Sequence, residues 1–329
     1  MQKEHVFLLS ACLLLDSMER RQLVNRYFQK QQQLALSKKQ YVLHLSTLWE
    51  WMLAADDAGS DATADFIAGN GKAIVTGKQE GIVAGIEEVV FLLRNKTNLL
   101  VTESVKDGAK VGKKEIWLTM EGSNQYLLSY ERTVLNILGR MSGIATLTSN
   151  LLSDVQKEEN PPFLAATRKT PLMFLDKKAV AIGGGLTHRL SLSDFPIIKD
   201  NHLEILKKGK LSIEKAIETA VKKTMQSFFE IEVKNVNEVH MVLKVLQSSG
   251  IKKDSFVCSI LLDNFTPLIA REVILEIKNH PLYKHVLLEA SGEITQENLS
   301  MWAKTGVDIL SMGILTHSSP TFNLSLKIV

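Results

Sequence analysis

Short apolar runs alternate with longer amphipathic stretches over the second half of the chain. The runs have the length of strands and are bounded by turn residues, which predicts six strands: Phe163 to Ala166, Pro196 to Ile198, Phe228 to Val233, Ser259 to Leu262, Val286 to Glu289 and Asp308 to Met312. Between them, Thr266 with Pro267 opens one helix, and Thr295 opens another that closes at Gly306. Six such strand–helix units predict a parallel sheet. A full eight-fold barrel takes about 250 residues, so a reduced α/β barrel or an open doubly wound sheet fits better.

The first half of the chain has a different pattern. From residue 48 to about residue 130, a helix is mixed with short alternating strands, which indicates an α+β domain. Thr133 to Leu152 follows as a strongly amphipathic helix that we expect to bridge the two halves. Residues 1–47 are expected to form a helical extension, in which Glu19 to Gln40 is rich in Gln, Lys and Arg. The expected divisions are therefore 1–47, 48–152 and 153–314, and the sequence assigns no chemistry to the first.

Composition and charge exclude several classes of protein. The chain is 45% hydrophobic, as expected for a globular fold, and its net charge of +3 is too small to indicate a nucleic-acid binder. Two cysteines, Cys12 and Cys258, exclude a disulfide framework and a multi-cysteine zinc site and favour the cytoplasm. The apolar run from Val6 to Leu15 is too short to span a membrane, and no small-residue cleavage site follows it. An amphipathic helix is therefore preferred to a signal peptide.

Positive charge gathers where the predicted strands end. Ligands bind at the carboxyl ends of parallel strands, and there the sequence places Arg168 and Lys169 after the first strand and Lys199 after the second. His188 and Arg189 lie in the glycine-rich segment between those strands. Burying such cations costs several kcal/mol per ion unless each has a partner, so the cluster predicts an anionic ligand. Arg suits a carboxylate, which it grips with two parallel hydrogen bonds.

Two carboxylates follow on the next strands. Glu232 lies at the end of the third predicted strand, and Asp263 lies at the end of the fourth. Such a pair, facing a polyphosphate, is typical of Mg²⁺ binding, and it could also stabilise a cationic oxocarbenium-like centre. Ser291 and Gly292 precede the helix expected at Thr295 and could offer backbone N–H groups to a phosphate. The combined pattern indicates a site for a dicarboxylate beside a sugar polyphosphate and a metal ion.

The sequence resembles the quinolinate phosphoribosyltransferase family through an ordered set of short motifs that runs from about residue 50 to the end. The matching segments are Tyr-Glu-Arg-Thr at 130–133, Ser-Gly-Ile-Ala-Thr at 142–146, Thr-Arg-Lys-Thr at 167–170, Gly-Gly-Gly-x-x-His-Arg at 183–189, Ile-Lys-Asp-Asn-His at 198–202, Glu-x-Glu at 230–232, Leu-Leu-Asp-Asn-Phe at 261–265, Glu-Ala-Ser-Gly at 289–292 and Ser-Met-Gly-x-Leu-Thr-His at 311–317. Each motif is weak alone, and their order makes the set specific.

This resemblance implies an N-terminal α+β open-sandwich domain, which the C-terminal residues 315–329 rejoin, and an incomplete parallel α/β barrel of six to seven strands. It implies a homodimer that makes nicotinate mononucleotide from quinolinate and phosphoribosyl pyrophosphate with Mg²⁺, without a nucleic-acid or membrane partner. The implied quinolinate ligands are Arg132 (reaching across the dimer), Arg168, His188, Arg189 and Lys199. The implied catalytic residues are Lys169, Glu232 and Asp263, with Glu232 and Asp263 also facing the metal. Phosphoribosyl pyrophosphate would bind Lys169, Ser291, Gly292 and Gly313.

The chain also departs from the family pattern. The extension is unusual, Ser60 replaces the glycine of Gly-Asp-x-Thr, and the stretch from Thr170 to Ala179 lacks Pro-Gly-Leu-Arg. Glu293 replaces the second glycine of Ser-Gly-Gly, and its charge could weaken a phosphate site. Two other functions stay open: a related phosphoribosyltransferase acting on another base, and a non-catalytic regulatory paralogue. Plainer explanations also exist for single residues; His188, for example, could be a packed imidazole.

Overall fold

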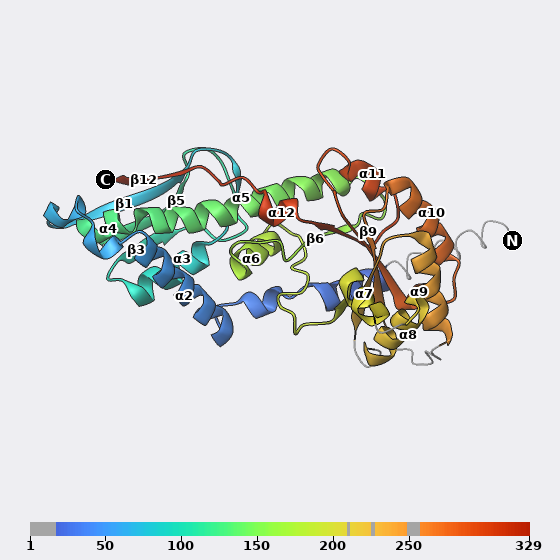
Figure 1. Cartoon of the computed structure of the whole chain (residues 1–329). Coiled ribbons are helices and arrows are strands. Elements are labelled where there is room, and N and C mark those ends of the chain that lie inside the picture. The colour runs from blue at the N-terminus through green and yellow to red at the C-terminus, as the bar shows by residue number, and fades with distance from the viewer. Residues whose placement is uncertain (1–17, 209–210, 225–227, 249–256) are drawn as a thin grey trace. The chain divides into compact units, whose positions relative to one another are not determined.

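The computed structural model describes residues 18–208, 211–224, 228–248 and 257–329 (Figure 1). Cys12 and the apolar run from Val6 to Leu15 lie outside these residues. The chain divides into two compact units. The parallel-sheet unit contains the described residues up to Gln29, Leu152–Thr167 and His188–Met312, and the antiparallel-sheet unit contains Lys30–Leu151, Arg168–Thr187 and Gly313–Val329.

Six strands form the parallel sheet, and the sequence predicted each of them to within about two residues at either end. They are β6 (Phe163–Ala166), β7 (Ile197–Ile198), β8 (Phe229–Val233), β9 (Cys258–Asp263), β10 (Val286–Ser291) and β11 (Ile309–Met312). Their order is β6-β11-β10-β9-β8-β7, and all neighbours are parallel. From β7 to β11 each strand lies beside its successor, and the first strand lies beside the last. This is the cyclic order of a barrel that is open between β6 and β7, which confirms the predicted α/β class.

The helices of this unit lie between its strands from β7 onward. They are α7 (Asp200–Lys208), α8 (Ile213–Thr224), α9 (Val236–Ser248), α10 (Pro267–Lys278) and the short α11 (Leu299–Ala303). Thr266 caps α10 as expected, because its side chain accepts a hydrogen bond from the Ile269 N–H. The prediction that a helix begins at Thr295 is wrong. Helix α11 begins at Leu299, and the Thr295 N–H donates to Asn298 Oδ1 at 2.9 Å.

Residues 18–28 form a helix that packs in the parallel-sheet unit. Arg20 hydrogen-bonds the Asp308 carboxylate, just before β11, and the Val286 carbonyl at the start of β10. Phe28 is fully buried, and its ring meets the rings of His188 and Phe195 edge-on. Part of the predicted N-terminal extension is therefore core structure of this unit.

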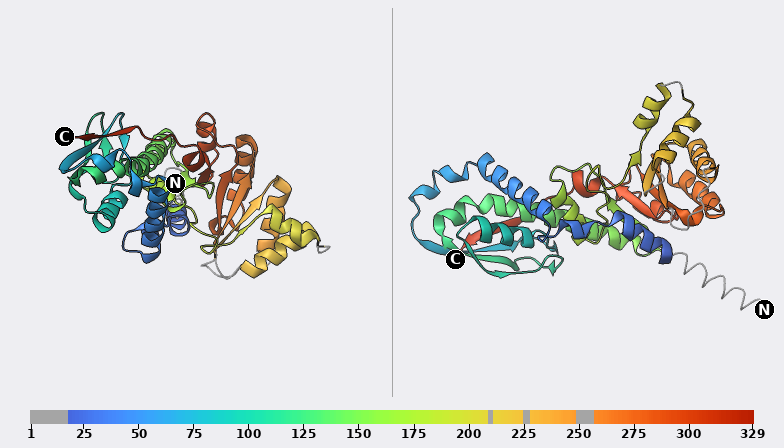
Figure 2. Two further views of the ribbon diagram at one scale, coloured as in Figure 1. Left: turned by 60° about the vertical axis from the view of Figure 1, so that its left-hand side comes forward. Right: turned by 90° about the horizontal axis from the view of Figure 1, so that it is seen from below.

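The antiparallel-sheet unit is built on four strands in the order β12-β1-β5-β3. They are β1 (Asn70–Gly77), β3 (Leu100–Ser104), β5 (Ile116–Ser123) and β12 (Leu324–Ile328); β2 (Gly81–Ile82) pairs separately with β4 (Lys110–Val111). The C-terminal strand β12, red in Figures 1 and 2, lies antiparallel beside β1. This unit confirms the expected N-terminal α+β domain.

The helices of this unit are α2 (Lys39–Ala55), α3 (Ile86–Lys96), α4 (Asn124–Ser129), α6 (Phe174–Ile182), α12 (Ile314–His317) and most of α5 (Glu131–Val155). Helix α2 runs through residue 47, where the sequence placed a division. Gly143 of α5 packs so closely on the C-terminal segment that an added Cβ would lie 1.9 Å from the Pro320 carbonyl oxygen. Among the described helices, none has the length and apolar content needed to cross a membrane.

Candidate active site

One face of the parallel sheet carries an unusual set of polar side chains. Side chains alternate along a strand, and the parallel register aligns Glu230 of β8 with Ser259 of β9, and Glu232 with Leu261 and Glu289. The residues two positions apart on each strand therefore face the same side. This shared face carries Glu230, Glu232, Ser259, Asp263, Glu289, Ser291 and Ser311.

Lys199 and Glu232 form an ion pair at this face. The Lys199 Nζ lies 2.8 Å from Glu232 Oε2, and Glu232 is buried while the Lys199 side chain is 43% exposed. The lysine follows the two-residue strand β7 directly, and the register of β7 with β8 brings it to the end of the neighbouring strand. The structure thus brings together two residues that the sequence placed in the site.

Asp263 and Ser291 are also in contact. The Ser291 hydroxyl donates to Asp263 Oδ1 at 2.6 Å, and the Asn264 side-chain amide donates to Oδ2 at 2.9 Å. Gly292, with φ of 92°, lies against Asn264, where an added Cβ would be 2.1 Å from Oδ1 and 2.8 Å from the backbone nitrogen. Glycine is therefore required here by the close approach of Asn264. Glu293 is exposed and also has a positive φ, 46°.

These residues fit a magnesium ion. Mg²⁺ prefers oxygen ligands and is commonly held by one or two carboxylates together with substrate phosphates and water. Glu232 and Asp263 lie on neighbouring strands, on the same face and at the same end of the sheet. Glu232 and Asp263 are therefore the residues that could hold such an ion, together with substrate phosphates.

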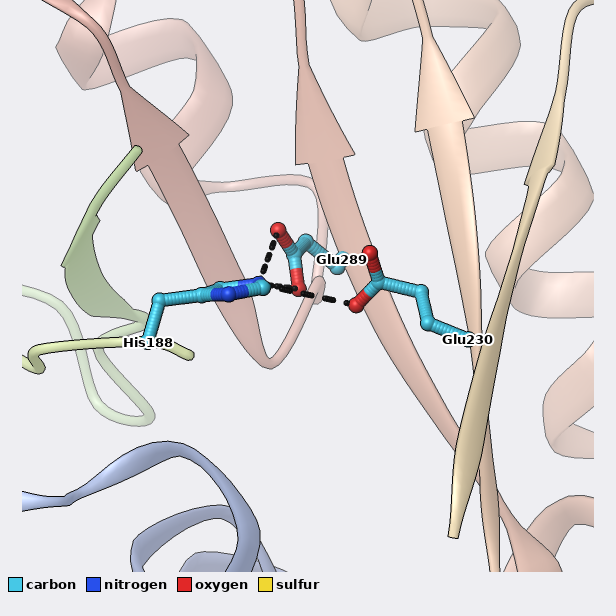
Figure 3. Close-up of side chains that lie close together, drawn as sticks. All are labelled: His188, Glu230 and Glu289. Carbon is cyan, nitrogen blue, oxygen red and sulfur yellow. Dashed lines mark hydrogen bonds and ion pairs between the residues drawn. The ribbon is translucent and has the colours of Figure 1, made fainter. Parts of the chain in front are cut away.

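Below this layer, His188 points inward to two buried glutamates that the sequence did not assign to the site (Figure 3). Its Nε2 lies 3.2 Å from both oxygens of Glu289 and 3.6 Å from Glu230 Oε2. All three residues are buried, and the ring also packs against Phe28 and Phe195. His188 therefore takes the position of a packed imidazole rather than presenting Nε2 at the rim of the sheet. The sequence feature that could have identified these glutamates is their charge, because Glu230 and Glu289 lie inside otherwise apolar strands.

The pKa values of the two acids in this cluster are shifted in opposite directions. Burial, followed by the charge of Glu289, raises the pKa of Glu230 to about 8. Burial would also raise the pKa of Glu289, but hydrogen bonds and charge from His188, Glu230 and Ser311 lower it overall. The pKa of His188 shifts with them: burial lowers it, but the charges of and hydrogen bonds with Glu289 and Glu230 raise it overall, to about 9.

Arg189 follows His188 and is buried in the same unit. Its Nη1 donates to the Phe195 carbonyl at 3.2 Å, which ties the start of the loop to a residue two positions before β7. Asp194 closes the same loop by accepting the backbone N–H groups of Leu190 and Ser191. The loop that carries this arginine is therefore held by its own hydrogen bonds.

Four of the predicted site residues belong to the antiparallel-sheet unit. Arg132 is exposed on α5 and pairs only with the adjacent Glu131, at 3.2 Å, among the contacts found in the described chain. Arg168 and Lys169 are exposed, and the Lys169 carbonyl accepts the Thr316 hydroxyl at 2.8 Å. Gly313 lies beside Lys169 Cδ, which an added Cβ would meet at 3.6 Å. Lys169 and Gly313 are thus brought together within their own unit.

Comparison with known proteins first defines the class. The structure of the nicotinate-nucleotide pyrophosphorylase from Francisella tularensis superimposes with a TM-score of 0.74 at 29% identity, covering 87% of this chain and 96% of that one. The corresponding structure from Ehrlichia chaffeensis gives 0.71 at 28% identity, covering 86% and 98%. A probable nicotinate-nucleotide pyrophosphorylase (carboxylating) from Archaeoglobus fulgidus is 36% identical over 78% of this chain and 94% of its own. The fold is that of this class of phosphoribosyltransferase.

The family assignment follows from two domain matches. The N-terminal domain of quinolinate phosphoribosyl transferase matches residues 57–142, and the C-terminal domain matches residues 144–327. The chain belongs to the quinolinate phosphoribosyltransferase family, as its motifs indicated.

Proposed function

We propose that this protein transfers the phosphoribosyl group of phosphoribosyl pyrophosphate to quinolinate and releases pyrophosphate and CO₂, giving nicotinate mononucleotide. The observation that carries the proposal is the pairing of Lys199 with Glu232 beside the Asp263–Ser291 pair at one end of the sheet. Lys199 is thus placed to bind a carboxylate of the substrate. Glu232 and Asp263 lie beside it and are placed to bind a metal ion together with the polyphosphate. The relatives from Archaeoglobus fulgidus and Francisella tularensis are named for this activity.

The proposed ligands divide by charge. Arg168, Arg189, Lys199 and, from a partner subunit, Arg132 bind the two carboxylates of quinolinate. Lys169, Ser291, Gly292 and Gly313 bind phosphoribosyl pyrophosphate. Glu232 and Asp263 would hold Mg²⁺, which when bound would supply positive charge to neutralise the departing pyrophosphate. When quinolinate binds, Lys199 exchanges part of its contact with Glu232 for the substrate carboxylate, which leaves Glu232 facing the sugar and the metal.

The reaction then proceeds in two steps. The bond from ribose C1 to pyrophosphate breaks with its electron pair on pyrophosphate, and Glu232 and Asp263 stabilise the positive charge that develops at C1. The pyridine nitrogen donates its lone pair to C1. The bond from ring carbon 2 to its carboxylate breaks, CO₂ leaves, and the carbon takes up a proton from solvent. The positive ring nitrogen and the arginines stabilise the electron pair left on that carbon.

The proposal includes a homodimer, in which Arg132 completes the partner's site, and a cytoplasmic location. Arg132 is exposed, and Glu131 is its one ion-pair partner among the described residues, which supports a role outside its own subunit. The two cysteines, of which Cys258 is a buried free thiol, are compatible with a reducing compartment.

A product assay tests the proposal. Purified full-length protein is incubated with phosphoribosyl pyrophosphate, Mg²⁺ and either quinolinate or nicotinate, and nicotinate mononucleotide is separated by chromatography. We expect product with quinolinate and none with nicotinate. Product from another base in place of quinolinate would indicate the related phosphoribosyltransferase. Binding of quinolinate without pyrophosphate release would indicate a regulatory paralogue.

A further inference from the structure

A closed ring of hydrogen bonds surrounds the backbone of Lys169 and Thr170 in the antiparallel-sheet unit. Asp176, in the first turn of α6, is fully buried and accepts the Thr170 hydroxyl at 2.6 Å. Arg140 of α5 donates to both oxygens of Asp176 at 2.9 Å, and its Nη2 also donates to the Thr316 carbonyl. The Thr316 hydroxyl donates to the Lys169 carbonyl at 2.8 Å and closes the ring. The backbone that carries Lys169 is therefore held by side chains of α5, α6 and α12.

The turn that joins this loop to α6 is strained. Met173, the residue before α6, has a φ of 46°, which residues with a side chain rarely adopt. The Leu172 N–H donates to Asp176 Oδ2 at 3.4 Å, and the Met173 carbonyl accepts the Lys177 N–H at 3.2 Å. A strained turn persists only where its surroundings hold it, and Asp176 supplies part of that hold. This turn lies in the stretch where the chain departs from the family pattern.

Helix α6 gives the ring a fixed frame on α5. Gly183, just after α6, packs so closely that an added Cβ would lie 2.5 Å from the Ala145 carbonyl oxygen of α5. The pair of Arg140 with Asp176 joins the same two helices at the other end of α6. A buried ion pair adds little stability over apolar side chains of similar volume. What this pair adds is the acceptor that Asp176 offers to the loop before α6.

We propose that Asp176, held by Arg140, is a positioning residue that fixes the Arg168–Leu172 loop, and with it Arg168 and Lys169, for binding the two substrates. Both of these side chains are exposed, so their placement depends on the backbone that carries them. Asp176 is fully buried and acts through that backbone. The inference rests on the proposed function, in which Arg168 binds quinolinate and Lys169 binds phosphoribosyl pyrophosphate.

A paired substitution separates positioning from stability. Asp176→Leu combined with Arg140→Met removes both charges, leaves no unpaired buried ion and keeps apolar side chains in their place. We expect this variant to fold, with a melting temperature within about 5 °C of wild type. The loop nevertheless loses its acceptor. The dissociation constant of quinolinate, measured by calorimetry, and KM for phosphoribosyl pyrophosphate should each rise by about tenfold or more.

Thr170→Val tests the loop contact alone. Valine has nearly the shape of threonine but lacks the hydroxyl, and the pair of Arg140 with Asp176 stays intact. We expect both substrate constants to rise by about threefold or more. Hydrogen exchange, measured by mass spectrometry on peptides that cover residues 167–173, reports on the loop without using the reaction. Exchange should be about fivefold faster or more in Thr170→Val and in the paired variant.

The matched control is a second buried ion pair on the same helix. Lys178 of α6 pairs with Glu88 of α3, and their side chains are 6% and 0% exposed. Lys178→Met with Glu88→Gln removes both charges and keeps an acceptor for the Tyr41 hydroxyl, which donates to Glu88 at 2.8 Å. This variant should keep wild-type substrate constants and loop exchange, because the hydrogen bonds of this pair lead to α2 and α3 rather than to the loop.

Three results would overturn the inference: wild-type substrate constants in the folded paired variant, unchanged exchange of residues 167–173 in that variant, or an equal loss in the control. If the paired variant does not fold, Thr170→Val provides the same comparison. A folded wild-type protein that binds quinolinate without forming product would refute the proposed function. The calorimetric and exchange comparisons would still decide the role of Asp176.

Discussion

The helix at residues 18–28 should be required for the stability of the parallel-sheet unit, and Arg20→Ala tests this. The Arg20 guanidinium donates from Nε to Asp308 Oδ1 at 3.0 Å and from Nη2 to Oδ2, and it also donates to the carbonyls of Tyr283 and Val286 at 2.8 and 3.0 Å. The Arg20 and Asp308 side chains are 9% and 14% exposed. The guanidinium also stacks on the Tyr283 ring, 4.0 Å from its centroid.

The expected loss can be worked from these contacts. Breaking a buried ion pair by removing one partner costs about 3–5 kcal/mol. Asp308 keeps a hydrogen bond from the Leu288 N–H at 2.7 Å, so its charge retains one partner. We therefore expect a decrease of about 3 kcal/mol, at the lower end of that range.

Hydrogen exchange measured by mass spectrometry is the appropriate assay, because a chain with two units need not unfold in one transition. The opening free energy is read from peptides that cover β10 and β11. Arg21→Ala is the matched control; Arg21 donates to the Pro161 carbonyl at 2.9 Å and stacks on Phe163, and its loss should cost about 1 kcal/mol or less. Equal effects of the two substitutions would refute this account of the helix.

Three further substitutions test other parts of the structure. Gly143→Ala should lower the free energy of unfolding, measured by chemical denaturation, by about 1–3 kcal/mol, because the new Cβ would meet the Pro320 carbonyl. Gly59→Ala is the control: an added Cβ there would have nothing within 4 Å, and the free energy of unfolding should change by less than about 0.5 kcal/mol. Lys199→Ala should weaken quinolinate binding, measured by calorimetry, by about 10- to 100-fold through loss of a charge-assisted hydrogen bond; unchanged affinity would remove Lys199 from the site. Glu293→Gly should lower KM for phosphoribosyl pyrophosphate by about two- to fivefold, because it removes an anion beside the proposed phosphate turn. Glycine suits this position, since Glu293 has a positive φ. An unchanged KM would mean that the carboxylate points away from the phosphate.

The sequence predicted the parallel sheet well because its strands are apolar runs bounded by turns and charged residues. Thr266 caps α10 through a local hydrogen bond, which a sequence pattern can indicate. Thr295 has the same residue type, but its N–H is taken by Asn298 and the helix begins later. The residue type alone did not distinguish the two cases.

Other parts depend on contacts between distant residues. Helix α6 carries Asp176, Lys177 and Lys178 in succession, and all three are buried. They are tolerated because each has a partner: Arg140 pairs with Asp176, and Glu88 pairs with Lys178. Lys177 donates to the Thr187 carbonyl. No local pattern shows such partners, so the sequence did not predict this helix.

The buried glutamates illustrate the same limit. Glu230 and Glu289 break otherwise apolar strands, and a charged residue in a buried strand needs a partner. The sequence showed that these glutamates need a partner, but it did not identify the partner. His188 lies in a loop about 40 residues before Glu230 and 100 before Glu289. His188 itself was expected to face the substrate, and the structure turns its Nε2 toward these acids.

The central claim is that the carboxyl ends of β8 and β9 carry the chemistry of quinolinate phosphoribosylation. The most direct measurement is the release of CO₂ and pyrophosphate from quinolinate and phosphoribosyl pyrophosphate, compared between wild type and Asp263→Asn, with quinolinate binding measured on the same samples. We predict equal amounts of the two products from wild type, a loss of about 100-fold or more in rate for the variant, and unchanged quinolinate affinity. Wild-type rates in folded Asp263→Asn, or pyrophosphate release without CO₂ from the wild type, would contradict the account.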